Sequence, residues 1–173
     1  MTKDTTDAAD LLVQLAPWLA QYAPEIGQAV ELTKFSVGQS NPTYELVTEQ
    51  GRYVLRAQPA GVLLKSAHAV DREFRIMKAL AQTDVPVPNV RVLCDDDAVI
   101  GTMFYVMDFI EGRVFKDPGL PSLAKTERGK VFESAATTLA KLLAVDGRAA
   151  GLEDDGKPSD DIARQIKRWS GQF

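Results

Sequence analysis

The stretch from residue 35 to residue 73 constrains the fold more than any other part of the chain. Apolar and polar residues alternate over 43–48 and again over 52–57, and a period of two is typical of half-buried β-strands. Gln50 and Gly51 are expected to form the hairpin turn between these strands. Helical spacing follows, so the stretch predicts paired strands and a helix that packs against them.

The side chains of the third strand divide between two faces. Tyr53, Leu55 and Ala57 point one way, so Arg56 points toward whatever covers the opposite surface. We expect Ser66 to cap the following helix. The apolar face of that helix consists of Val70, Phe74, Met77 and Leu80. Glu73 lies at the edge of this face, where a carboxylate can meet a strand cation.

A polar turn precedes the second strand, and Gly38 in it allows backbone conformations that other residues resist. The turn supplies small polar residues and donors: Gly38, Gln39, Ser40, Asn41 and Thr43. A donor-rich turn, a cation on the third strand and a helix carboxylate that holds the cation are the parts of a nucleotide clamp.

Composition limits the class of protein. The net charge of −4 comes from 24 acidic and 20 basic residues, which argues against a nucleic-acid partner because such proteins usually carry a basic face. The single cysteine, Cys94, excludes an intrachain disulfide and fits a reducing compartment. No apolar run approaches a membrane-spanning length and the start is polar, so we expect a soluble, cytoplasmic protein without a membrane partner.

The flanking segments add helices and strands. A first helix stopped near Pro24 is expected, with Asp7 as its cap and Pro17 as a possible kink. Its apolar stripe is formed by Leu11, Leu12, Leu15, Leu19 and Tyr22. A strand is expected over 30–35, and extended or buried strands are expected over 90–94 and 104–107.

Beyond residue 112 the pattern is helical only. Pro118 and Pro121 mark an irregular connection, the best candidate for a boundary between lobes. A long amphipathic helix follows, with Phe132, Ala135, Ala136, Leu139, Leu142 and Leu143 on one face. A last helix carries Ile162, Ile166, Trp169 and Phe173. Exposed apolar faces on these helices could support an oligomer.

Six segments occur in the order of a known family: G-Q-S-N-P-T-Y at 38–44, Y-V-L-R at 53–56, S-A-H-A-V-D-R-E-F at 66–74, D-V-P-V-P at 84–88, F-Y-V-M-D-F at 104–109 and R-Q-I-K-R-W at 164–169. The chain resembles the aminoglycoside phosphotransferase family, particularly the branch found with acyl-CoA dehydrogenases. The resemblance implies an α+β, protein-kinase-like N-lobe with a five-stranded antiparallel sheet and a helix, followed by the first helices of a helical C-lobe. The implied divisions are an N-terminal helix over 1–29, the nucleotide-binding N-lobe over 30–112, and a linker with a partial C-lobe over 113–173.

The resemblance also implies roles for single residues. Residues 38–43 would lie over the phosphates of ATP, and Arg56 stands where many kinases have lysine, with Glu73 as its partner. The substitution matters because arginine is a planar fork and lysine a compact point charge. Met107, Asp108 and Ile110 would form the hinge, where backbone groups of Asp108 and Ile110 could pair with adenine.

The family carries its catalytic aspartate and the asparagine for one magnesium after a His-Gly-Asp type sequence, with a further metal-binding aspartate in the larger lobe, and His68 is the only histidine here. We therefore expect this chain to be the N-terminal part of a longer kinase, inactive alone, with the Mg²⁺ ligands outside it. The implied reaction is transfer of the ATP γ-phosphate to the hydroxyl of a small molecule. The branch suggests a hydroxyacyl thioester or another small metabolite as the acceptor, in preference to an antibiotic.

Three alternatives remain open on the sequence. Arg56 and Glu73 could be an ordinary surface pair, and such pairs contribute about 0 to 1 kcal/mol. The protein could instead be a non-catalytic, pseudokinase-like module that binds nucleotide, or an interaction module that exposes the apolar faces around Leu139 and Trp169.

Overall fold

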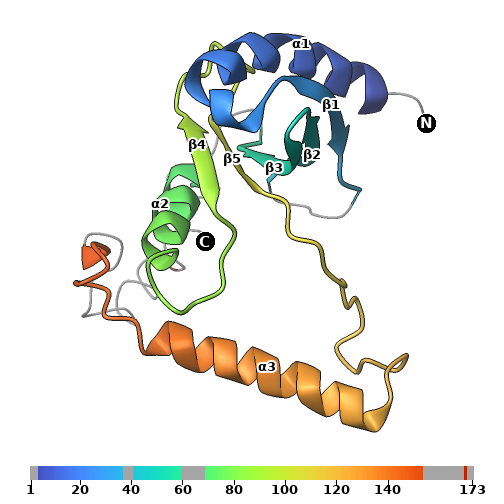
Figure 1. Ribbon diagram of the computed structural model, residues 1–173, viewed down its shortest axis with the longest axis vertical. Coiled ribbons are helices and arrows are strands. Elements are labelled where there is room, and N and C mark those ends of the chain that lie inside the picture. The colour runs from blue at the N-terminus through green and yellow to red at the C-terminus, as the bar shows by residue number, and fades with distance from the viewer. Residues whose placement is uncertain (1–3, 37–40, 60–68, 154–169, 171–173) are drawn as a thin grey trace.

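The computed structural model describes residues 4–36, 41–59, 69–153 and 170 of the chain. The elements in chain order are α1 (Asp4–Tyr22), the short 3-10 helix η1 (Pro24–Ile26), β1 (Ala29–Lys34), β2 (Thr43–Thr48), β3 (Gly51–Ala57), α2 (Val70–Leu80), β4 (Val90–Cys94), β5 (Phe104–Asp108) and α3 (Lys125–Leu143). Figure 1 shows α1 over the sheet, α2 beside β4, and α3 apart from both.

The five strands form one antiparallel sheet in the order β1-β2-β3-β5-β4. The two faces of β3 contact different helices, and the side chains divide between these faces as the alternation in the sequence predicts. Leu55 is buried in the core with Leu15 and Leu19 of α1, whereas Arg56 contacts Glu73 of α2. The two helices therefore lie on opposite faces of the sheet.

The main core lies between α1 and the sheet. Leu15 and Leu19 are 0% and 1% exposed, and the ring of Trp18 meets Phe104 edge-on at 5.1 Å between centroids. The helix continues through Pro17, so the proline does not divide it. Two expectations for this helix are wrong. Asp7 lies inside α1 and is not its cap, and Tyr22, the last residue of α1, is 56% exposed.

The β2–β3 hairpin turns one residue earlier than predicted. Thr48 pairs with Gly51 across the ladder, so Glu49 and Gln50 form the turn and Gly51 is the first residue of β3. Gly51 has a φ of 150°, a conformation that favours glycine. Ser66, the expected cap of the next helix, lies outside the described residues, and α2 begins at Val70, preceded by Ala69.

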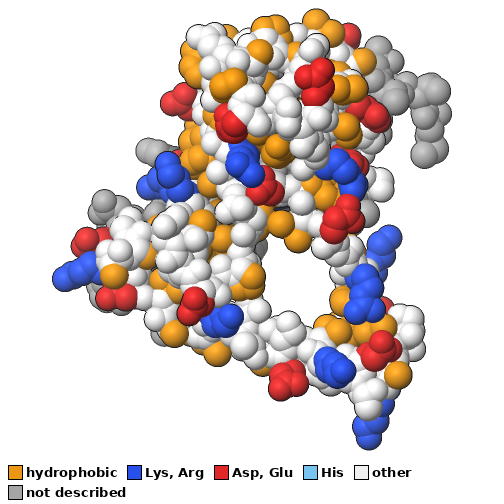
Figure 2. All heavy atoms as spheres, in the orientation of Figure 1, with side chains coloured by type: hydrophobic (Ala, Val, Ile, Leu, Met, Phe, Trp, Pro, Cys, Tyr) orange, Lys and Arg blue, Asp and Glu red, His pale blue; other side chains and the backbone are white. Residues whose placement is uncertain are grey.

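After β5, the chain runs through an irregular connection to α3. None of residues 125–143, all of which are described, is buried. The apolar residues Phe132, Leu139, Leu142 and Leu143 are 57%, 56%, 44% and 77% exposed. Figure 2 shows an open gap between the sheet, the connection and α3. The predicted helix around 162–173 lies outside the described residues, apart from Ser170.

Within the described part of the chain, no helix combines the length and the apolar character needed to cross a membrane.

Candidate functional site

The predicted contact between Arg56 of β3 and Glu73 of α2 is present. Arg56 Nε donates to Glu73 Oε2 at 2.7 Å, and Arg56 Nη2 donates to Oε1 at 3.3 Å. This two-point contact uses the planar fork of arginine, which a lysine could not reproduce. The two side chains are 29% and 37% exposed, so the pair is reachable from solvent and is not a buried structural bridge.

Two residues from the C-terminal side of the polar turn join this pair. Asn41 Nδ2 donates to Glu73 Oε1 at 3.3 Å, and Arg56 Nη1 donates to Thr43 Oγ1 at 3.2 Å. The Thr43 hydroxyl in turn donates to the backbone carbonyl of Asn41 at 3.0 Å. The turn is therefore bonded to both members of the ion pair. Gly38, Gln39 and Ser40 lie outside the described residues.

Tyr105 of β5 is a member of this network that the sequence interpretation missed. Its hydroxyl donates to Glu73 Oε2 at 3.1 Å, and its ring meets Phe74 edge-on at 6.1 Å between centroids. The segment containing Tyr105 was interpreted only as an apolar central strand. The pairing of β3 with β5 could have identified it, because Tyr105 is directly opposite Arg56 and therefore lies on the same face of the sheet.

Burial raises the pKa of Tyr105 well above its ordinary value, and the negative charge of Glu73 raises it further, against a smaller lowering by Arg56. The tyrosine therefore stays protonated at neutral pH and acts as a hydrogen-bond donor.

The predicted hinge residues lie at the end of β5. Met107 is half-buried opposite Val54, and Ile110 is 62% exposed. The backbone N–H of Asp108 donates to the Asn89 carbonyl at 2.9 Å, so this amide is engaged within the protein.

The side chain of Asp108 is also held within the protein. Its carboxylate accepts from Arg91 Nε at 2.6 Å, from Arg91 Nη2 at 3.0 Å and from Asn89 Nδ2 at 3.1 Å. Partial burial acts to raise the pKa of Asp108, but the hydrogen bonds from Arg91 and Asn89 outweigh it, so the pKa is lowered.

An aromatic surface lies on the Arg56 face of the sheet, close to the hinge. The Arg52 guanidinium lies 3.9 Å from the centre of the Phe109 ring, and Phe35 stacks on Phe109 at 6.5 Å between centroids. Glu45 and Glu111 both pair with Arg52. Alternation puts Arg52 and Arg56 on the same face of β3, so this cluster and the ion pair border one surface.

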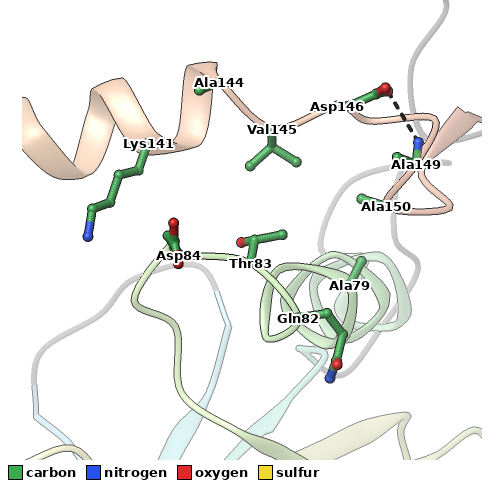
Figure 3. Close-up of a pocket in the computed structure, with 10 residues that line it drawn as sticks. All are labelled: Ala79, Gln82, Thr83, Asp84, Lys141, Ala144, Val145, Asp146, Ala149 and Ala150. Atoms are coloured by element: carbon green, nitrogen blue, oxygen red, sulfur yellow. Dashed lines mark hydrogen bonds between the residues drawn. The ribbon is translucent and has the colours of Figure 1, made fainter.

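A cavity of about 620 Å³ lies elsewhere, between the C-terminal ends of α2 and α3. Figure 3 shows that Ala79, Gln82, Thr83 and Asp84 face Lys141, Ala144, Val145, Asp146, Ala149 and Ala150 across it. None of the predicted nucleotide-binding residues that the structure describes lines this cavity. Among the described residues, no group of three or more His, Cys, Asp or Glu side chains could hold a metal ion.

The model of the phosphotransferase enzyme family (APH) matches residues 31–172. The chain belongs to this family. A crystal structure from Ralstonia eutropha JMP134, described as a candidate aminoglycoside phosphotransferase, has a TM-score of 0.77 and 41% identity, covering 93% of this chain and 46% of that chain. The similarity confirms the α+β kinase-like fold and the predicted resemblance to aminoglycoside phosphotransferases.

Curated relatives of this phosphotransferase-family chain are acyl-CoA dehydrogenases. Acyl-CoA dehydrogenase family member 10 of Mus musculus is 46% identical over 144 residues, covering 83% of this chain and 14% of that protein. Probable acyl-CoA dehydrogenase IBR3 of Arabidopsis thaliana is 49% identical over 148 residues, covering 83% and 18%. Family member 11 of Mus musculus is 38% identical over 183 residues, covering 99% and 24%. The chain thus spans less than a quarter of the length of each.

Proposed function

We propose that this chain is the ATP-binding portion of a small-molecule phosphotransferase. In the whole protein, the γ-phosphate of ATP would pass to a substrate hydroxyl. The nucleotide would lie against the turn at residues 38–43, the Arg56–Glu73 pair and the hinge that contains Met107, Asp108 and Ile110.

The proposal rests mainly on the hydrogen-bond donors that Arg56 keeps available. Its hydrogen bonds to Glu73 and Thr43 use three of the five N–H groups that a guanidinium has, counted over the described residues. One hydrogen on Nη1 and one on Nη2 are left over. A partly exposed guanidinium that is held by a carboxylate and keeps two donors suits a phosphate oxygen.

The aromatic surface at the hinge supports the proposal at the other end of the nucleotide. A purine base binds by stacking on aromatic rings and on arginine planes, independently of how many hydrogen bonds its edge makes. Phe35 is 36% exposed, and its ring and that of Phe109 lie on the Arg56 side of the sheet. With the Asp108 amide engaged, we propose that stacking contributes more to base binding than hinge hydrogen bonds do.

ATP would supply the transferred phosphoryl group, and Mg²⁺ would accompany its phosphates. We assign no Mg²⁺ ligand to the described residues. For the acceptor, we propose a hydroxyacyl thioester, because the curated relatives are acyl-CoA dehydrogenases by name. This acceptor is a proposal for the whole protein, and catalysis there would come mainly from positioning and electrostatic stabilisation.

Titration of ATP and Mg²⁺ against the chain tests nucleotide binding. Arg56→Ala is expected to weaken the affinity about tenfold or more, the usual effect of losing a charged hydrogen bond to a phosphate. Arg148→Ala is the matched control. Arg148 is 84% exposed and pairs only with Glu153 among the described residues, so its loss should leave the affinity unchanged. Equal affinities for the wild-type chain and Arg56→Ala would reject the role of Arg56.

A further inference from the structure

The carboxylate of Glu73 accepts four hydrogen bonds, and only two of them come from Arg56. Oε1 accepts from Arg56 Nη2 and Asn41 Nδ2, and Oε2 accepts from Arg56 Nε and the Tyr105 hydroxyl. A carboxylate offers about four acceptor positions, so Glu73 is saturated. Each oxygen therefore accepts one hydrogen bond from Arg56 and a second one from a residue outside α2, which is Asn41 for Oε1 and Tyr105 for Oε2.

The two additional donors differ in rigidity. Tyr105 is 2% exposed, lies on β5 between β3 and β4, and has its ring against Phe74. Asn41 is also buried, at 5% exposure, but it precedes β2 next to the polar turn. Tyr105 is therefore the rigid donor that holds Glu73 in place, while Asn41 links Glu73 to the polar turn.

A rigidly placed donor matters because Glu73 has a long side chain that is 37% exposed on α2. A free glutamate loses rotamer freedom on being held, and that loss opposes the bidentate contact with Arg56. A hydroxyl placed by the sheet offsets the loss by keeping Oε2 in one position. Since Oε2 also accepts the shorter of the two bonds from Arg56, at 2.7 Å against 3.3 Å, a fixed Oε2 favours one orientation of the guanidinium.

We propose that Tyr105 is a positioning residue that orients Arg56 through Glu73. Its consequence for nucleotide binding rests on the function proposed above, whereas its effect on the ion pair does not. Tyr105 itself is not proposed to touch the nucleotide.

The first test needs no nucleotide. The Arg56 Nε–H donates to Glu73, so its NMR signal should be separated from those of free arginines and its exchange with water should be slow. In Tyr105→Phe, which keeps the ring and removes only the hydroxyl, we expect this exchange to become about fivefold faster or more as the ion pair opens more often. An exchange rate equal to that of the wild type would overturn the proposal.

Tyr53→Phe is the matched control. Tyr53 is a buried tyrosine two residues before Leu55, on the α1 face of the same sheet, so removing its hydroxyl should leave the Arg56 exchange rate unchanged. The thermal midpoint of each variant is measured alongside. Equal loss of Arg56 protection in both variants would indicate general loosening of the sheet and would also overturn the proposal.

The second test measures ATP affinity. Tyr105→Phe should weaken binding about 3- to 10-fold in the wild-type background and have no further effect in Glu73→Gln, because residues that act through one another are not additive. If the wild type binds ATP and Tyr105→Phe binds it equally well, Tyr105 has no positioning role and the proposed function stands. If the wild type does not bind ATP, the proposed function fails, and the exchange measurement alone decides on Tyr105.

Discussion

The hydroxyl of Thr48 shows how a single buried polar group can join two parts of this fold. Thr48 is 6% exposed at the end of β2, and its Oγ1 donates to the carbonyl of Ile26 in η1. The same oxygen accepts from the backbone N–H of Gln50 at 3.1 Å. One side chain therefore bonds the β2–β3 turn and the segment that follows α1.

Replacing Thr48 with valine should reveal the contribution of this hydroxyl. Valine keeps the shape but leaves the Ile26 carbonyl and the Gln50 amide without their partner, so we expect Thr48→Val to lower the free energy of unfolding by about 1–3 kcal/mol. Urea unfolding measures the change. Thr48→Ser keeps the hydroxyl and should lose less. A valine variant as stable as the wild type would show that water replaces the hydroxyl at no cost.

At the level of helices and strands, the sequence predicted the sheet well because alternation is a local signal. β2 and β4 have the predicted bounds, and β1 and β5 each differ by one residue at one or both ends. The hairpin turn was misplaced by one residue because glycine is common both in turns and as a strand residue with positive φ. The contact of Arg56 with Glu73 was also predictable, since strand alternation and helix periodicity each place one of the two side chains.

The rest of the site depended on pairing between strands that are distant in the sequence. Tyr105 could be recognised only with the β3–β5 register in hand, because a tyrosine in an apolar run is also an ordinary core residue. The engagement of the Asp108 amide by Asn89 depends on the start of β4, where the register shifts between Val90 and Val92. Periodicity carries no information on such irregularities.

The Asp108–Arg91 pair joins the beginning of β4 to the end of β5, and its contribution should depend on pH. The pKa of Asp108 is lowered in the folded protein, so the stabilisation is present above its ordinary pKa of about 3.9 and is lost as pH falls through the folded value. We expect Asp108→Asn to cost about 0.5–1 kcal/mol at pH 7, a value that takes account of partial exposure, and almost nothing near pH 2.

Unfolding of the wild type and Asp108→Asn in urea at both pH values provides the measurement. Asp97→Asn is the control, because Asp97 is an exposed aspartate in the turn between β4 and β5. A difference between the wild type and Asp108→Asn that is the same at both pH values would mean that charge on Asp108 does not stabilise the strands.

Over the whole molecule, the part formed by α1 and the sheet buries its apolar residues more completely than α3 does. The sheet and α1 form a closed core, whereas α3 keeps Phe132, Leu139, Leu142 and Leu143 exposed. The amphipathic pattern predicted the helix correctly, but a pattern cannot state what covers an apolar face. In a solution of the chain, the same face of α3 on another copy offers an apolar surface that can cover it.

We therefore expect the chain to self-associate through α3 at micromolar to millimolar concentration, which sedimentation velocity would detect as a rise in mean mass with concentration. Leu139→Glu combined with Leu143→Glu places two charges on the exposed stripe and should return the chain to a monomer. Because both leucines are exposed, the stability of the fold should change little. Thr137→Glu adds a charge elsewhere on α3 and should leave association intact. A wild-type chain that stays monomeric over this range would show that these exposed residues are too few, or too far apart, to hold two copies together.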